Sequence, residues 1–179
     1  MTTMKIDPSA AARERTARIF IDTFATFSTG DCLLVRTPNC VQQFAPHSIA
    51  PPTMSNSAFA AHLAHLGEVM SSFPLTVKEM IDNPTANQVL IWATASPLWL
   101  PSVTGGVGKS GAGGEEVDWA YTGEYMFLLS FEDGEAGEDG NGGKLKRLER
   151  VIEFVDSKGT TKLYGLMEKA RRILRGVEV

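Results

Sequence analysis

The sequence is poor in cysteine, in long apolar runs and in clustered positive charge, and each shortage excludes a class of protein. Only two cysteines, Cys32 and Cys40, occur in 179 residues, too few for a disulfide framework or a cysteine zinc site. No apolar run approaches the ~18 residues of a membrane-spanning helix, so we expect no membrane partner. The net charge is −4 and no basic run occurs, which argues against binding to nucleic acid.

Common catalytic fingerprints are missing as well. No GxSxG or dinucleotide-binding motif occurs, and GGVGKS at 105–110 is not a phosphate loop, because Val103 stands where that motif needs glycine. His62 and His65 are three residues apart but have no third ligand nearby, so we interpret them as a surface pair. We therefore expect neither a metal nor a cofactor.

What the chain does contain is typical of one globular domain spanning residues 1–179. Hydrophobic residues make up 43% and charged residues 21% of the sequence. Charged side chains in the first twenty residues leave no room for the apolar core of a signal peptide, so we expect a cytoplasmic protein. Two stretches, 104–116 and 132–143, hold 11 of the 17 glycines. Because glycine packs nothing and maximises chain entropy, we expect flexible loops there, inserted at hairpin ends.

Hydrophobic periodicity predicts an α+β fold. Apolar residues recur at helical spacing near 8–28, near 56–71 and from about 160 onward. Between the last two helices the period changes to two, which predicts four long antiparallel strands between 75 and 156, and 41–45 has the pattern of a short strand. The order of elements favours a curved antiparallel sheet wrapped over helices.

The strand predicted over 117–131 carries the richest set of candidate site residues. Trp119, Tyr121, Tyr125 and Phe127 share one parity, and an aromatic row with two hydroxyls is how a mostly apolar pocket is lined. Core aromatics whose hydroxyls find partners would produce the same pattern. Trp92 is a candidate for the same pocket wall, and His47 for its mouth, although a loop histidine more often faces solvent.

Glu153 is the candidate for proton transfer. It lies in RVIEFVD with apolar neighbours on both faces of the predicted strand, an environment that raises a carboxyl pKa and suits a general acid or base. Arg36, in the apolar context LLVRTP, is a plausible partner. It would either hold Glu153 ionised, in a purely structural pair, or present its guanidinium to a substrate oxygen.

The phrases LLVRTPNCVQQFAP, YTGEYMFLLSFEDG and LKRLERVIEFVDS resemble fungal SnoaL-like proteins of the nuclear-transport-factor-2-like superfamily, over roughly residues 10 to 175. The resemblance implies a cone of curved antiparallel sheet that encloses one pocket and often dimerises through the sheet. The chain is most similar to the isomerase and semipinacolase branch of natural-product pathways. That branch implies site roles for Arg36, Tyr121, Tyr125 and Glu153.

The function expected from this resemblance is a cofactor-independent isomerase or cyclase acting on a small hydrophobic secondary metabolite, as a homodimer. Glu153 would move a proton, Arg36 would stabilise an oxyanion, and the two tyrosines would orient the substrate. Two alternatives stay open, because function belongs to the site and not to the fold. One is a non-catalytic ligand-binding or dimerising module, and the other is a dehydratase or hydrolase that uses the same carboxylate.

Overall fold

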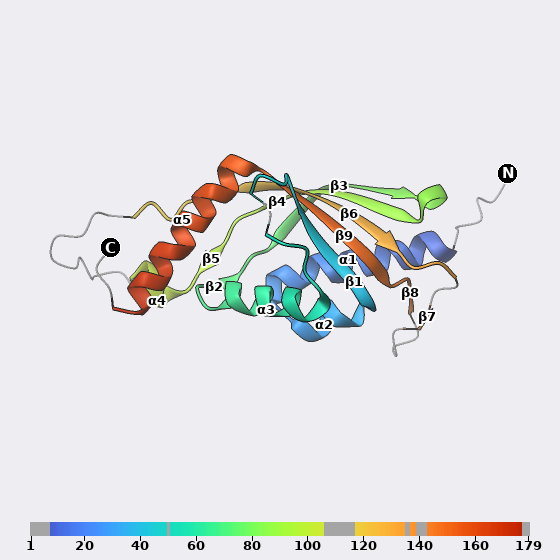
Figure 1. The fold of residues 1–179 in the computed structure, drawn as a ribbon, viewed down its shortest axis with the longest axis horizontal. Helices are drawn as coiled ribbons and strands as arrows, with labels where there is room; N and C mark the ends of the chain where they lie inside the picture. Colours follow the sequence, from blue (N-terminus) through green and yellow to red (C-terminus); the bar gives the residue numbers. More distant parts are fainter. Residues whose placement is uncertain (1–7, 50, 106–116, 135–136, 139–142, 177–179) are drawn as a thin grey trace.

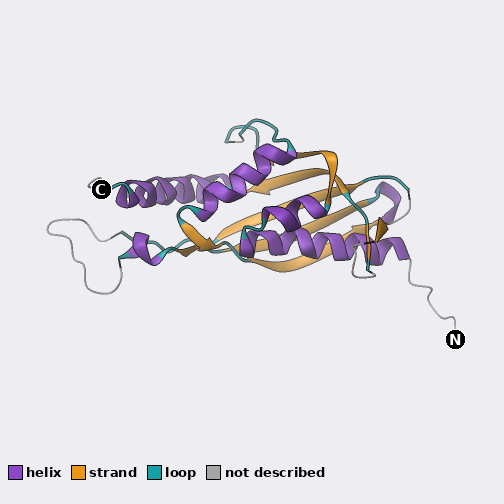
Figure 2. Cartoon of the chain, turned by 90° about the horizontal axis from the view of Figure 1, so that it is seen from below, coloured by secondary structure: helices purple, strands orange, loops and turns teal. Residues whose placement is uncertain are grey.

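A curved sheet packed on two helices forms the body of the chain, and a long C-terminal helix crosses one end of it (Figure 1). The computed structural model describes residues 8–49, 51–105, 117–134, 137–138 and 143–176. Seen from below, the N-terminal helix and the third helix lie side by side over one face of the sheet (Figure 2). Within the described residues, no helix is both long and apolar enough to span a bilayer.

The elements follow the predicted order, with additional short pieces between the long ones. In chain order they are α1 (Pro8–Thr26), α2 (Thr29–Leu34), β1 (Arg36–Ala45), α3 (Asn56–Gly67), β2 (Met70–Ser72), β3 (Leu75–Asn83), η1 (Pro84–Ala86), β4 (Gln88–Ala95), β5 (Leu98–Trp99), α4 (Pro101–Thr104), β6 (Gly123–Phe131), β7 (Gly137–Glu138), β8 (Lys144–Leu145), β9 (Leu148–Val155) and α5 (Ser157–Leu174).

The main sheet has five strands in the order β1-β9-β6-β4-β3. The pairs among β3, β4, β6 and β9 are antiparallel, as predicted. The edge pair differs, because β1 runs parallel to β9. The sheet is therefore mixed, and β1 is longer than the predicted strand 41–45: it begins at Arg36 and contains Pro38 at a register shift near the sheet edge, where a missing N–H is tolerated. The predicted α+β class with a curved sheet is confirmed.

Several predicted boundaries were wrong for local reasons. Residues 117–122 are not strand, and β6 begins only at Gly123. The helix predicted over 56–71 ends at Gly67, after which the chain forms β2. The helix expected from about 160 begins at Ser157, because the side chain of Asp156 accepts hydrogen bonds from the backbone N–H groups of Lys158 and Gly159. Most of the two glycine-rich stretches lies outside the described residues.

The core lies between the inner face of the sheet and the helices. Phe20 and Phe24 on α1, Phe59 on α3 and Phe127 on β6 are almost fully buried, and their ring centroids lie 5.5–6.5 Å apart. The contacts are edge-to-face, tilted or stacked, and such ring pairs stabilise the fold beyond the area that they bury. This aromatic cluster anchors both helices to the strands that carry the candidate site.

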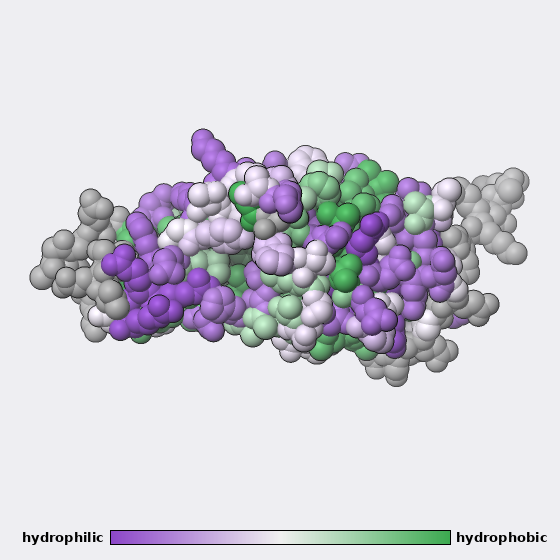
Figure 3. Space-filling view, viewed as in Figure 1, coloured by the Kyte–Doolittle hydropathy of each residue, from purple (hydrophilic) through white to green (hydrophobic). Residues whose placement is uncertain are grey.

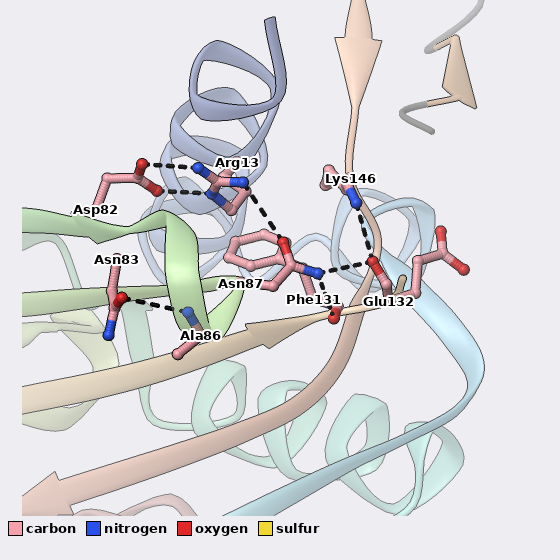
Figure 4. Close-up of polar contacts among 8 residues, drawn as sticks. All are labelled: Arg13, Asp82, Asn83, Ala86, Asn87, Phe131, Glu132 and Lys146. Atoms are coloured by element: carbon pink, nitrogen blue, oxygen red, sulfur yellow. Dashed lines mark hydrogen bonds and ion pairs between the residues drawn. The ribbon is translucent and has the colours of Figure 1, made fainter. Parts of the chain in front are cut away.

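Four polar side chains hold the end of the sheet at which β3 turns into β4 (Figure 4). We call these residues, Arg13, Asp82, Asn87 and Lys146, the polar clamp. Arg13 on α1 donates two hydrogen bonds to the carboxylate of Asp82, at 2.6 and 2.7 Å. Asn87 is in the left-handed conformation, with φ of 51°, and its amide donates to the carbonyls of Phe131 and Glu132. The buried Lys146 also donates to the carbonyl of Glu132. The start of β4, the end of β6 and the segment between β8 and β9 are thereby joined.

Candidate active site

The candidate site is built on the inner face of β1, β9 and β6, on the side of the sheet that the helices cover. Glu153 on β9 is only 5% exposed. In the sheet register it lies between Phe44 of β1 and Phe127 of β6. A carboxyl group thus stands between two aromatic residues and is almost fully removed from solvent.

Burial changes the protonation of Glu153. Loss of solvation raises the pKa of its carboxyl group to about 8, and a hydrogen bond from Gln42 opposes the rise. At neutral pH the group is therefore mainly the neutral acid. A carboxylic acid in this state can give a proton to a substrate and take one back, which is the requirement for general acid–base catalysis.

Glu153 is connected to Arg36 through one amide. The Gln42 Nε2 donates to Glu153 Oε2 at 2.9 Å, and Arg36 Nη1 donates to Gln42 Oε1 at 3.1 Å. Gln42 is fully buried. The two residues singled out in the sequence are therefore brought together, but through Gln42 and not by a direct ion pair.

Arg36 is held in place from three sides. Its Nε donates to Asn56 Oδ1 at 2.8 Å, and its guanidinium carbon lies 4.8 Å from the centroid of the Phe59 ring. The side chain is 2% exposed, and its Nη2 has no hydrogen-bond partner. A buried guanidinium with an unpartnered NH2 group can stabilise negative charge that develops on a nearby oxygen.

Tyr125 and Tyr164 lie near enough to Glu153 for its charge to raise their pKa values, and Tyr121 is linked to Tyr125. The hydroxyl oxygens of Tyr121 and Tyr125 are 2.9 Å apart and share one hydrogen bond. Burial raises the pKa of Tyr125, with smaller contributions from Tyr121 and Glu153. Tyr164 on α5 is 45% exposed, and partial loss of solvation raises its pKa, with the charge of Glu153 adding to the rise. These are all three tyrosines of the chain, and each stays a hydroxyl donor at neutral pH.

Of the remaining predicted pocket residues, Phe127 joins this group and the others do not. Phe127 is fully buried, lies opposite Glu153 in the sheet and stacks on Tyr125, with ring centroids 6.3 Å apart. Trp119 precedes β6 and packs on Trp99, with ring centroids 5.1 Å apart. His47 is an exposed residue of the loop after β1.

Trp92 lies on the other side of the sheet from Glu153. Its side chain is 42% exposed and lines an open groove of about 230 Å³. The other residues that line this groove are Glu79, Ile81, Leu90 and Met126. Trp92 therefore corrects the prediction of a common wall, because strand alternation places Ile91 and Ala93 inward and Trp92 outward.

Sequence reasoning missed four polar residues near the site: Gln42, Asn56, His62 and Tyr164. His62 was interpreted as part of a surface pair, but it packs against Phe44 and Phe59, with centroid distances of 5.7 and 6.1 Å. Burial lowers the pKa of His62 to about 4, with His65 adding to the effect. Its place beside Phe59 on the helical wheel was the only available signal. Across the described ranges, no cluster of three or more residues suited to bind a metal occurs.

Comparison of sequences finds no family model that matches the chain and no curated protein similar to it. Comparison of structures finds clear relatives in fold. The BvnE pinacolase from Penicillium brevicompactum is 21% identical, with a TM-score of 0.65 over 94% of this chain and 97% of that one. AusH from Aspergillus nidulans is 20% identical, with a TM-score of 0.59 over 86% of both chains.

A bacterial protein has the same fold. A protein from Shewanella denitrificans described as a SnoaL-like polyketide cyclase is 13% identical, with a TM-score of 0.56 over 85% of this chain and 96% of that one. At these identities the likeness establishes the fold and not the reaction. The SnoaL-like fold predicted from the sequence is confirmed.

Proposed function

We propose that the chain is an isomerase or cyclase that acts on a small hydrophobic substrate by general acid–base catalysis, without a cofactor. The observation that carries this proposal is the buried Glu153, whose pKa of about 8 keeps it a neutral acid inside an apolar site. A lone carboxyl group of this kind suits a reaction in which a proton is moved and no atom is gained or lost.

A semipinacol-type rearrangement fits these groups. In such a step a carbon substituent shifts to a neighbouring electrophilic carbon, while one substrate atom gains a proton and a hydroxyl group loses one. Glu153 would donate the first proton, and its carboxylate would accept the second, so that protons balance over one turnover. Arg36 would stabilise negative charge on a substrate oxygen, and Tyr121 and Tyr125 would orient the substrate. The likeness in fold to a pinacolase supports this choice of reaction.

The test uses a panel of α-hydroxy ketones and α-hydroxy imines on indole and polycyclic cores. Products are followed by NMR and chiral chromatography for the wild type, Glu153→Gln and Glu149→Gln. The last variant is a matched control, because Glu149 lies on the same strand but is exposed. We expect the first variant to lose ~10²- to 10⁴-fold in rate and the control to keep it.

The outcomes separate the candidate functions. A folded Glu153→Gln protein that turns over normally would contradict the catalytic role of the carboxyl group. Ligands that bind the wild type without reacting would favour a binding module. Loss of water from a hydroxylated substrate would favour a dehydratase, and cleavage of a substrate bond by water would favour a hydrolase.

We further propose that the protein is a homodimer, paired through the outer face of the sheet. Trp92, Met126 and Phe154 are each more than 40% exposed there and form one row across three strands. Leu128 and Ile152 pair in the next row on the same face. Hydrophobic side chains gather over the middle of the strands and hydrophilic ones toward both ends (Figure 3). A contiguous apolar patch on a sheet face is typical of a contact surface, and a two-fold pairing covers it with the same patch of a second copy.

A further inference from the structure

A directed chain of hydrogen bonds ends at Glu153. The amide nitrogen of Asn56 donates to the carbonyl of Thr37 at 2.8 Å and to that of Pro38 at 3.2 Å. Its oxygen Oδ1 accepts from Arg36. Arg36 then donates to Gln42, and Gln42 donates to Glu153. We call these three residues, Asn56, Arg36 and Gln42, the relay.

The direction of each bond in the relay is forced by chemistry. A guanidinium group can only donate, so the amide of Gln42 must turn its oxygen toward Arg36. Its nitrogen then faces Glu153, and Glu153 Oε2 must be the acceptor. Asn56 has no freedom to flip either, because its nitrogen is held by two backbone carbonyls. The backbone of Gln42 is also fixed, by two 2.9 Å bonds to Met54.

We propose that Gln42 is a positioning residue that, held by Arg36, keeps Oε2 of Glu153 as the accepting oxygen and leaves Oε1 as the oxygen that carries the acid proton. This inference deepens the proposed function and rests on it for its catalytic meaning. The carboxyl group would then offer its proton in one direction only. When Oε1 gives up the proton, the N–H of Gln42 remains on Oε2 and stabilises the carboxylate that forms.

The other groups around Glu153 do not perform this task. Tyr125 on β6 and Tyr164 on α5 are close enough for the charge of Glu153 to affect their pKa values, and both are hydroxyl donors at neutral pH. His62 on α3 is neutral and packs against Phe44. Arg36 is the cation, and it donates its hydrogen bonds to Gln42 and Asn56. Among the described residues, Gln42 makes the hydrogen bond to Glu153 that is fixed in direction.

The test measures the titration of Glu153 in the ligand-free protein, so it does not depend on turnover. Glutamate labelled with ¹³C at the carboxyl carbon is followed by NMR from pH 4 to 10, and the Glu153 signal is assigned by its loss in Glu153→Gln. Gln42→Leu removes the donor, and we expect the midpoint to rise above the value of about 8 by about one pH unit. Gln43→Leu is the matched control, because Gln43 is the next residue of β1 and its side chain points to the opposite face. Its midpoint should stay unchanged.

Gln42→Glu is the second variant, and its near-identical shape guards against a failure to fold. The new carboxylate at position 42 would accept from Arg36 and could only accept from Glu153, so the neutral acid is favoured and the midpoint rises again. A folded Gln42 variant whose Glu153 midpoint equals that of the wild type would overturn the proposal. If the midpoints move as expected but no substrate of the panel reacts, the relay stands and the proposed function fails.

Discussion

Tyr121 reaches the hydroxyl of Tyr125 by lying across Gly123. The two residues are four apart, yet their oxygens are within 2.9 Å of each other. This is possible because the side chain of Tyr121 occupies the space in which residue 123 would carry its Cβ atom. Gly123 is therefore required for room and not for an unusual backbone angle, since it is a regular residue of β6.

Gly123→Ala should break the tyrosine pair. A Cβ atom there would overlap the hydroxyl of Tyr121 and come within 2.8 Å of its ring carbon Cζ. Tyr121 must then leave, which frees a buried hydroxyl on Tyr125 and costs about 1–3 kcal/mol of unfolding free energy. Urea denaturation measures this cost. Tyr121→Phe has already lost this hydrogen bond, so adding Gly123→Ala to it should cost less than the same change costs the wild type; an equal cost in both backgrounds would contradict this explanation.

Glu153→Gln should change the pH dependence of stability. Its pKa of about 8 in the folded state exceeds that of the unfolded chain, so the folded state holds more protons between those values. The wild type therefore loses unfolding free energy as pH rises from about 4.5 to 8, by at most about 1.4 kcal/mol per pH unit. The variant has no such loss. The Tm of the variant minus that of the wild type should therefore increase from about pH 4.5 to about pH 8 and stay constant at higher pH. A pH-independent difference in Tm, measured by calorimetry, would show that Glu153 is already ionised in the folded protein.

Asn87→Gly tests the side-chain hydrogen bonds of the polar clamp without disturbing the backbone conformation of residue 87. Glycine accepts the φ of 51° at this position, so only the hydrogen bonds to Arg13, Phe131 and Glu132 are lost. We expect a loss of about 1–3 kcal/mol in urea denaturation, because the carbonyls and Arg13 stay partly buried. Asn83→Ala is the comparison, since the single bond from the N–H of Ala86 to Asn83 is exposed. An equal loss of unfolding free energy in both variants would show that the polar clamp does not stabilise the fold.

Trp92→Lys should convert a dimer into a monomer. A lysine in the centre of the outer face would place two ammonium groups in a desolvated interface, one from each copy. Leu98→Lys is the control, because Leu98 is 56% exposed but lies on β5, outside the main sheet. Sedimentation at micromolar concentration distinguishes the two. A wild-type monomer under these conditions would contradict the homodimer itself.

Local patterns predicted the long elements, but pairings far apart in the chain were beyond them. Glu153 could be found because apolar residues flank it on both sides within one strand. Gln42 could not, because 111 positions separate it from Glu153 and only the parallel pairing of β1 with β9 brings them together. Trp92 was assigned to the wrong face because both alternating sets of β4 contain large apolar residues. His62 sits at the edge of an apolar helical stripe, where sequence alone does not decide between core and solvent.

The positions of the three tryptophans give the protein its own optical reporters. Trp99 and Trp119 pack against each other as a tilted pair near the start of β6, and Trp92 stands apart on the outer face of the sheet. Indole emission shifts to longer wavelength when the ring meets water. Dilution that separates two copies should therefore change the emission of Trp92, while events near the tyrosines should change that of the pair. Trp92→Phe would leave a signal from one side of the sheet alone, so that association and ligand entry can be read separately in the same molecule.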